Sequence, residues 1–226
     1  MAKPQVFVTR IIPDAGLDKV KAFCEADIWT DPLPPPHDVL VERTRGKDGI
    51  LSLLTDRIDA AFMDACPSLK VISNFAVGFN NIDIAAATER GIPVGNTPDV
   101  LTEATADMEF CLLIAAARRL VESERSIHAG KWLTWEPMGY IGADLVGKTV
   151  GIVGMGRIGT GLAKRCAGGW DMRVLYHDVY QNKEAEAATG ARKVDLDTLL
   201  AESDFVSVHA NLTDETHGMF NASAFK

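Results

Sequence analysis

The stretch Thr149-Val150-Gly151-Ile152-Val153-Gly154-Met155-Gly156-Arg157-Ile158-Gly159 decides the fold of this chain. Residues 149–153 form a short apolar run that is typical of a buried strand, and residues 161–167 continue as a helical pattern. Between the two, three glycines stand in the spacing G-x-G-x-x-G. This spacing alone is a weak signal, but a strand before it and a helix after it are the context of a dinucleotide-binding turn.

Each glycine of such a turn has its own physical task. The first allows a tight turn, the second lets the backbone approach a pyrophosphate, and the third lets helix and strand pack closely. The N-terminus of the following helix then presents free N–H groups and a partial positive charge to the phosphates. We therefore expect the cofactor phosphates to contact Gly154, Gly156, Arg157, Ile158 and Gly159.

An acidic residue follows the next predicted strand. Asp178 comes directly after residues 173–177, within the loose spacing of about 20 residues that the fingerprint allows. A carboxylate there accepts hydrogen bonds from the ribose hydroxyls and repels a 2′-phosphate. Because Val179, Tyr180 and Gln181 come next and no Arg does, the sequence favours NAD over NADP. The alternative is a plain turn beside a surface acid.

The rest of the chain alternates strand and helix patterns, which predicts parallel sheets. Apolar runs typical of strands precede helical patterns from residue 5 to residue 97 and again from residue 149 onward. We therefore expect an α/β protein with two doubly wound parallel-sheet domains. Residues 1–98 form the first, flavodoxin-like domain, and residues 99–226 form a Rossmann domain. One uninterrupted helix is expected from Glu103 to His128, with Thr102 as its N-cap, followed by a Trp-rich loop.

Composition excludes several classes of protein. The chain has 226 residues and a formal net charge of −8, and it lacks a basic stripe, which argues against a nucleic-acid surface. The longest apolar run, residues 110–117, is too short to span a membrane, and nothing at the N-terminus has the form of a signal peptide. The four cysteines lie far apart, so we expect no metal site and reduced thiols in the cytoplasm, with Cys111 and Cys166 in the core.

Four stretches together resemble the D-isomer-specific 2-hydroxyacid dehydrogenases. They are the cofactor signature at 147–159, the loop Val77-Gly78-Phe79-Asn80-Asn81-Ile82-Asp83, the crossing at 90–98 with Thr105-Ala106-Asp107, and residues 209–216, which look like H-x-P-L-T-x-E-T. Residues 131–137 are similar to the glyoxylate/hydroxypyruvate reductase branch. Asn211 departs from the family, which usually has Pro there, and Asp178 departs from the NADP-preferring reductases of this branch.

The resemblance implies a substrate-side first domain and residue roles that the sequence alone does not favour. It implies that the backbone N–H groups of Val77 and Gly78 bind a substrate carboxylate and that Leu54 lines the substrate pocket. Taken alone, Leu54 favours a core position, and Gly78 a strand-end turn with positive φ. The resemblance also implies cofactor contacts for a further set of residues, for some of which helix capping is the alternative: Thr105, His209, Ala210 and Thr216.

The activity that the resemblance implies is NADH-linked reduction of a 2-keto acid, such as glyoxylate or hydroxypyruvate, to the D-2-hydroxy acid. The family's catalytic Arg, Glu and His fall after Lys226, so none is assigned here, and His209 has no matched acid in the family pattern. We therefore expect an incomplete Rossmann domain, with a helix beginning near Asn221, and no turnover from this chain alone.

The sequence also predicts a partner and leaves two other functions open. The long helix and the aromatic loop from Trp132 to Tyr140 predict a homodimer joined through the cofactor domain. One rival is a non-catalytic NAD-sensing regulator of the same fold. The other is a different Rossmann enzyme, such as a methyltransferase, because a fold does not fix a function.

Overall fold

The structure is a computed structural model that describes residues 2–225. Its contacts divide the chain into two compact units, Met1–Val100 and Leu101–Lys226. The division falls two residues after the boundary expected at Pro98. Each unit is built on a sheet of parallel strands, so the expected α/β class is confirmed.

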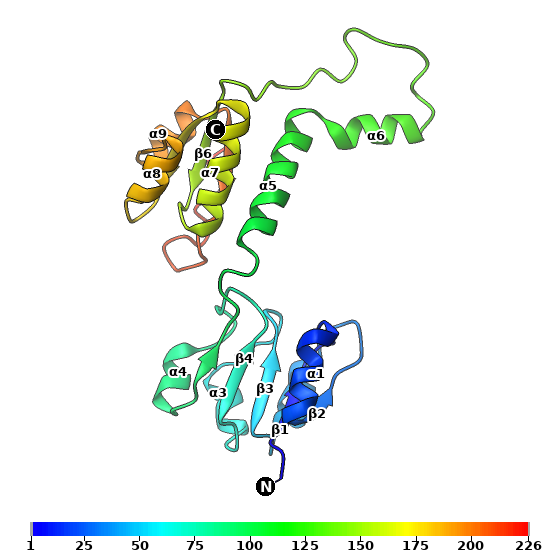
Figure 1. The fold of residues 1–226 in the computed structure, drawn as a ribbon, viewed down its shortest axis with the longest axis vertical. Coiled ribbons are helices and arrows are strands. Elements are labelled where there is room, and N and C mark those ends of the chain that lie inside the picture. The colour runs from blue at the N-terminus through cyan, green and yellow to red at the C-terminus, as the bar shows by residue number, and fades with distance from the viewer. Residues whose placement is uncertain (1, 226) are drawn as a thin grey trace. The chain divides into compact units, whose positions relative to one another are not determined.

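The first unit carries a parallel sheet in the order β2-β1-β3-β4-β5, the order of flavodoxin-like folds (Figure 1). Its elements in chain order are β1 (Gln5–Val8), α1 (Asp14–Phe23), β2 (Glu25–Ile28), α2 (His37–Thr44), β3 (Gly49–Ser52), α3 (Ala60–Ala65), β4 (Val71–Asn74), α4 (Ile84–Glu89) and β5 (Val94–Gly95).

Alternation along the strands decides which helix covers which face of this sheet. Phe7 and Ile50 belong to a cluster with the residues of α2, α3 and α4, whereas Val8 and Leu51 pack against Leu17 of α1. Successive side chains of a strand point to opposite faces, so both faces are covered. The carboxyl ends of β3 and β4 are left free to carry loops.

The second unit carries a parallel sheet in the order β8-β7-β6-β9. Its elements are α5 (Thr102–Ala117), α6 (Leu120–His128), β6 (Thr149–Val153), α7 (Arg157–Trp170), β7 (Arg173–His177), α8 (Lys183–Thr189), β8 (Arg192–Lys193), α9 (Leu196–Glu202) and β9 (Phe205–Val208). This is the order of the first strands of a Rossmann sheet, with β6 at its centre.

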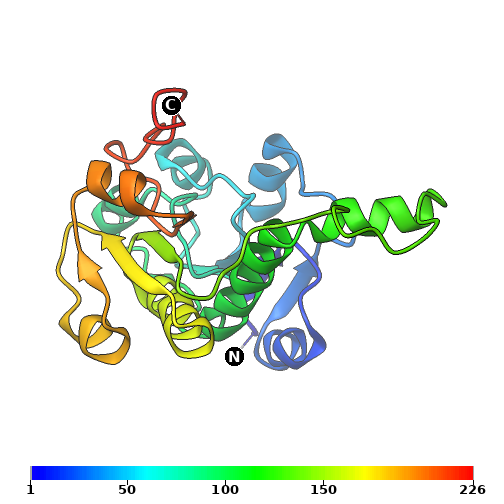
Figure 2. The same cartoon turned by 90° about the horizontal axis from the view of Figure 1, so that it is seen from above.

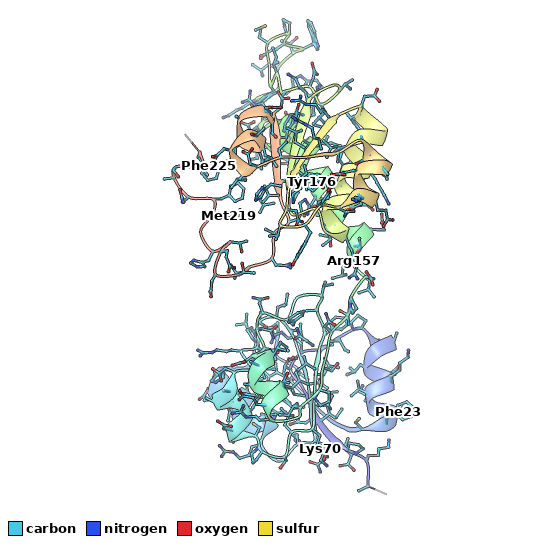
Figure 3. The ribbon with its side chains drawn as sticks, turned by 90° about the vertical axis from the view of Figure 1, so that its left-hand side faces the viewer. Phe23, Lys70, Arg157, Tyr176, Met219 and Phe225 are labelled. Carbon is cyan, nitrogen blue, oxygen red and sulfur yellow. The ribbon has the colours of Figure 1, made fainter. Side chains whose placement is uncertain are left out.

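The core of the second unit forms where α5, α7 and α8 cover one face of β6 and β7. Val150, Ile152 and Tyr176 are fully buried there with Leu162 and Cys166 of α7. Tyr176 lies inside the unit in Figure 3, and its hydroxyl donates to Glu186 at 2.8 Å. Burying one such side chain contributes roughly 1.5–3 kcal/mol, so this face accounts for much of the unit's stability.

The second face of this sheet depends on a glycine outside the G-x-G-x-x-G spacing. A Cβ placed on Gly151 in β6 would come within 2.5 Å of Leu199 Cδ2 and 2.4 Å of Ser203 Oγ. Both neighbours belong to α9 or to its C-cap, so only glycine lets this helix pack so closely on the central strand.

The expected uninterrupted helix from Glu103 to His128 is wrong. The structure contains two helices, α5 and α6, and the chain turns between them at Arg119, whose φ is +51°. In Figures 1 and 2 α6 and the loop after it extend away from the sheet of their own unit. Thr102 is also not the N-cap, because Leu101 holds that position and no side chain caps this helix.

Two smaller expectations also fail. Cys111 is exposed on α5, whereas Cys166 is buried as expected. The helical pattern near Asn221 forms turns in the part of the chain that the structure describes. Within residues 2–225 no helix is long and apolar enough to cross a membrane.

Candidate functional site

The glycine-rich turn follows β6 and has the geometry of a phosphate cradle. Gly154 has a φ of +98°, and a Cβ on it would come within 2.8 Å of the His209 carbonyl carbon. A Cβ on Gly159 would come within 2.3 Å of the Gly154 carbonyl oxygen. Gly156 is the N-cap of α7, and no atom lies within 4 Å of the Cβ position there. Two glycines thus permit close packing, and the middle one faces open space.

Two side chains hold the Met155 backbone inside this turn. The Met155 N–H donates to Asp178 Oδ2 at 2.7 Å, and Asn182 Nδ2 donates to the Met155 carbonyl oxygen at 2.8 Å. The C=O of one residue and the N–H of the next point in opposite directions across a trans peptide. Asn182 therefore turns the Gly156 N–H away from itself. The structure thus brings Asp178 to the turn.

Asn182 is not predicted from the sequence. Its Oδ1 accepts from the Ala185 N–H at 3.0 Å, so it is also the N-cap of α8. The signal was available, because Asn directly before Lys183-Glu184-Ala185 is a typical start of a helix. What the sequence does not reveal is that the same amide reaches the glycine turn.

His209 and Ala210 continue β9 and close the other side of the turn. The backbone from His209 to Ala210 packs directly on Gly154, so both residues lie beside the turn, and their cofactor contacts stay a prediction. The His209 ring is only 4% exposed, with Nε2 3.0 Å from Ser207 Oγ and Nδ1 3.2 Å from Glu109 Oε2. The structure therefore places an acid beside His209, for which the family pattern offered none.

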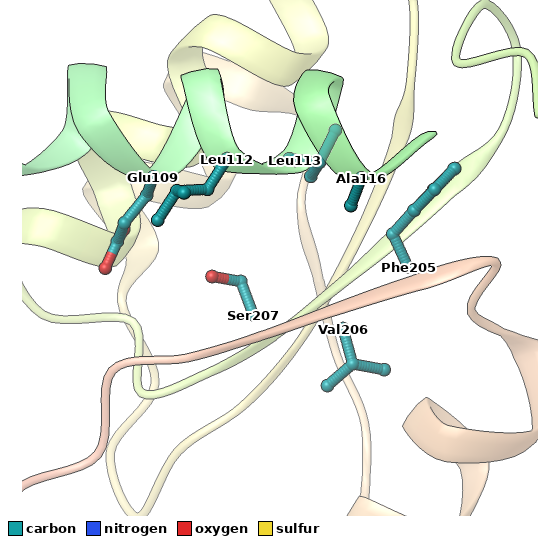
Figure 4. Close-up of a pocket in the computed structure, with 7 residues that line it drawn as sticks. All are labelled: Glu109, Leu112, Leu113, Ala116, Phe205, Val206 and Ser207. Atoms are coloured by element: carbon teal, nitrogen blue, oxygen red, sulfur yellow. The ribbon is translucent and has the colours of Figure 1, made fainter. Parts of the chain in front are cut away.

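Burial shifts both members of this pair toward their neutral forms. It lowers the pKa of His209 to about 4 and raises the pKa of Glu109. Glu109 Oε2 is buried without an aligned hydrogen bond. Beside the pair, a cavity of about 270 Å³ separates α5 from the edge strand β9, and Glu109 and Ser207 face it from opposite sides (Figure 4).

The remaining predicted cofactor residues lie in different environments. Thr105 is half-buried in the first turns of α5, Arg157 is exposed at the start of α7, and Ile158 is half-buried behind it. The Thr216 hydroxyl donates to the Asn211 carbonyl at 2.6 Å and accepts from the Thr213 N–H at 2.8 Å. Thr216 therefore closes the loop after β9. Its partner Asn211 stands at the position where the family usually has Pro.

The predicted carboxylate-binding residues lie in the first unit, in the loop after β4. We call residues 77–79 the carboxylate loop. Gly78 is exposed and Val77 half-buried, and no N–H of these residues donates to any residue that the structure describes. Backbone N–H groups of adjacent residues that have no partner are available to donate to an anion.

Two interpretations made from the sequence alone are wrong here. Gly78 does not have a positive φ, so a left-handed turn does not explain this glycine. Leu54 is not a core residue, because 53% of it is exposed. Its Cδ2 would lie 3.6 Å from a Cβ on Gly78, so Leu54 flanks the carboxylate loop. Within residues 2–225, no group of three or more His, Cys, Asp or Glu side chains is placed to hold a metal ion.

The chain is similar to a family model and to several named proteins. Residues 110–226 match the family model of the "D-isomer specific 2-hydroxyacid dehydrogenase, NAD binding domain". The glyoxylate reductase of Korarchaeum cryptofilum is 51% identical over 218 residues, which cover 96% of this chain and 65% of that protein. The glyoxylate reductase of Thermococcus litoralis is 47% identical over 228 residues, 99% of this chain and 69% of that protein. The chain thus spans about two thirds of the length of these relatives.

Solved structures agree with the sequences. The TT0316 protein of Thermus thermophilus superimposes with a TM-score of 0.90 at 42% identity, over 97% of this chain and 69% of that one. A D-lactate dehydrogenase from Aquifex aeolicus, complexed with NAD and lactic acid, gives 0.81 at 26% identity, over 97% and 64%. The resemblance seen in the motifs is confirmed, and the chain belongs to the D-isomer specific 2-hydroxyacid dehydrogenase family, with residues 110–226 in its NAD-binding domain.

Proposed function

We propose that this protein reduces a 2-keto acid, glyoxylate or hydroxypyruvate, to the D-2-hydroxy acid with NADH as the reductant. The observation that carries the proposal is the glycine turn, whose Met155 N–H is bound to the carboxylate of Asp178. An acid in this position beside an open turn fits a dinucleotide without a 2′-phosphate. In this proposal the second unit is the cofactor domain and the first unit binds the substrate.

The described residues fit NAD at one unit and a carboxylate at the other. The turn and the N-terminus of α7 offer N–H groups to the pyrophosphate, and Asp178 offers a carboxylate oxygen to the ribose. Contacts from Thr105, His209, Ala210 and Thr216 complete the proposed cofactor set. When bound, NADH supplies the hydride, and the protein supplies position and charge stabilisation. The carboxylate loop orients the keto acid by its charged end, with Leu54 beside it.

An oxidation assay on the full-length protein tests this proposal. NADH absorbance is followed with glyoxylate, with hydroxypyruvate and with neither, and NADPH is run in parallel. The proposal expects keto-acid-dependent NADH consumption and slower consumption of NADPH. Tight NADH binding without any turnover would favour the regulator, and absence of nucleotide binding would favour a different Rossmann enzyme. The relatives named glyoxylate reductase support the first outcome.

A further inference from the structure

We propose that Asn74, at the end of β4, is a positioning residue that presets the carboxylate loop for the carboxylate of the keto acid. The proposal rests on the proposed function, since it concerns the same substrate. Its basis is that the carbonyl groups of residues 76–78 each accept a hydrogen bond that fixes their direction. Asn74 donates one of these bonds and Asn96 another.

Each of these carbonyls accepts a hydrogen bond from a donor of the first unit. The Thr97 N–H donates to the Ala76 carbonyl at 2.9 Å. Asn96 Nδ2 donates to the Val77 carbonyl at 2.8 Å, and Asn74 Nδ2 donates to the Gly78 carbonyl at 2.9 Å. Every peptide bond of the chain is trans across the described residues. Because C=O and N–H oppose one another across a trans peptide, the N–H groups that follow these carbonyls point away from the three donors.

The result is an array of unused donors. The N–H groups turned outward are those of Val77, Gly78 and Phe79, none of which donates to a residue that the structure describes. Gly78 and Phe79 are exposed, so a small anion can reach them. Hydrogen bonds from backbone N–H groups to a charged acceptor are stronger than those between neutral groups. A carboxylate is the charged end that every 2-keto acid presents.

Asn74 is well placed to hold this array rigidly. It is only 1% exposed, and its Oδ1 accepts from Ser52 Oγ at 3.0 Å. Its Nδ2 also donates to Asn81 Oδ1 at 3.2 Å. The opposite orientation of the amide would set Oδ1 against the Gly78 carbonyl, two acceptors facing one another, so the hydrogen-bond network selects the orientation that holds the loop.

Asn81 ties this network to the loop after β3, which carries Leu54. Its Nδ2 donates to the Leu53 carbonyl at 3.1 Å and to the Asp56 carbonyl at 2.9 Å. The loop after β3 and the loop after β4 are thus joined through the amides of Asn74 and Asn81. A loop held in its binding conformation before the ligand arrives loses little conformational entropy on binding, so its affinity is higher.

The test compares Asn74→Ala with Ser52→Ala in the full-length protein. Ser52→Ala removes a buried hydroxyl from the same network and leaves in place the donors to all three carbonyls. We expect Asn74→Ala to raise the KM for glyoxylate at least about tenfold, the cost of a weakened charge-assisted hydrogen bond. The kcat and the KM for NADH should change less than about twofold, because the carboxylate contact is the same in ground and transition states. Ser52→Ala should leave the glyoxylate KM within about twofold of wild type.

An aldehyde without a carboxylate separates positioning from general damage. Glycolaldehyde cannot use the loop, so Asn74→Ala should leave its kcat/KM unchanged and narrow the preference for glyoxylate. An equal loss with both substrates, or an unchanged glyoxylate KM in a folded variant, overturns the proposal. If Asn74→Ala does not fold, Asn96→Ala decides, because Asn96 is exposed and frees the Val77 carbonyl alone; it should raise the glyoxylate KM and spare glycolaldehyde.

A binding measurement keeps this proposal separate from the proposed function. Oxalate is titrated into the ¹⁵N-labelled wild-type protein and into Asn74→Ala, and the amide resonances of Gly78 and Phe79 are followed. Shifts in the wild type that weaken in the variant support the loop even if no keto acid is turned over. Absence of shifts at these amides in the wild type overturns the loop even if glyoxylate is reduced.

Discussion

At the scale of single residues, Asp178 both shapes the glycine turn and stands where the ribose is expected. Its two oxygens accept from the N–H groups of Met155 at 2.7 Å and of Tyr180 at 3.1 Å. Asp178→Ala should weaken NAD binding roughly 10- to 100-fold, the range for losing a hydrogen bond to a charged group, and should narrow the gap to NADP. Asp178→Asn keeps an oxygen that accepts from the Met155 N–H. It should narrow the difference in affinity between NAD and NADP with a smaller loss of NAD affinity than Asp178→Ala. Calorimetry with both nucleotides checks this, and an unchanged NAD affinity in both variants would contradict the role of Asp178.

Asn182 allows the two tasks of one side chain to be separated. Asp caps a helix as well as Asn does but offers no donor to the Met155 carbonyl. Asn182→Asp should therefore keep the helix cap, lower the free energy of unfolding by about 1 kcal/mol through the lost bond to Met155, and weaken NAD binding by about 5- to 20-fold. Urea unfolding and nucleotide titration measure the two effects on one sample. A loss of stability without a loss of affinity would show that the turn does not depend on this amide.

The buried His209 predicts how stability depends on pH. Its pKa is about 4 in the folded chain and 6.5 in its ordinary range, so between these values only the unfolded chain takes up the proton. Stability from this group is complete above pH 6.5 and is lost as the pH falls toward 4, by about 2 kcal/mol at about pH 5. The raised pKa of Glu109 acts in the opposite direction above its ordinary value, so the net loss is smaller.

His209→Asn tests this linkage by urea unfolding at about pH 7.5 and about pH 5. The variant should lose less stability than wild type over this interval, because the histidine contribution is gone. His217→Asn, which changes an exposed histidine, is the matched control and should follow wild type. Identical losses in His209→Asn and wild type would show that the ring is not held neutral.

The residue scale also shows what the sequence can predict. The glycines of the turn and Asp178 were predicted because a fixed spacing between a strand and a helix determines where they lie. Asn74, Asn96 and Asn182 were not, because each acts by reaching a carbonyl elsewhere in the fold. A polar residue that ends an apolar strand, as Asn74 does, is a visible signal, but its partner becomes known only with the path of the loop.

At the scale of elements, the break between α5 and α6 is the largest difference between the structure and the prediction from sequence. The pattern from Glu103 to His128 has no Gly or Pro, and helical periodicity does not report a single residue in the left-handed region. Arg119 adopts φ +51°, and its side chain pairs with Glu122 at 2.6 Å and stacks over the Tyr140 ring. These two contacts hold the Arg119 side chain beside a left-handed backbone conformation that residues other than glycine rarely adopt.

The element formed by α6 and the following loop underlies the proposed homodimer. Exposed apolar side chains gather on it at 53–87% exposure, namely Leu120, Val121, Ile127, Trp132, Leu133, Trp135 and Met138. A set this large is unusual on a monomer and is the surface through which the homodimer predicted from the sequence would form. Light scattering of the full-length protein should give the mass of a dimer, and Trp132→Ser with Trp135→Ser should shift it toward the monomer. A wild-type monomer at micromolar concentration would rule the dimer out.

At the scale of the whole molecule, alternation of strands and helices was sufficient to predict the class. Both sheets are parallel in the structure, because each apolar run is followed by a helix that returns the chain to the same edge. Periodicity did not predict the order of the strands within each sheet. The fold brings together the residues of each candidate site separately, the glycine turn with Asp178 in the second unit and the carboxylate loop with Leu54 in the first.

The proposed function depends on the glycine turn being a site for NAD, and one titration measures that most directly. NADH and NADPH are titrated separately into the wild-type protein, with the heat or the quenching of tryptophan fluorescence as the signal. We predict that NADH binds at least about tenfold more tightly, since the Asp178 carboxylate accepts from the ribose of one and repels the 2′-phosphate of the other. Tighter binding of NADPH, or no binding of either nucleotide, would contradict it.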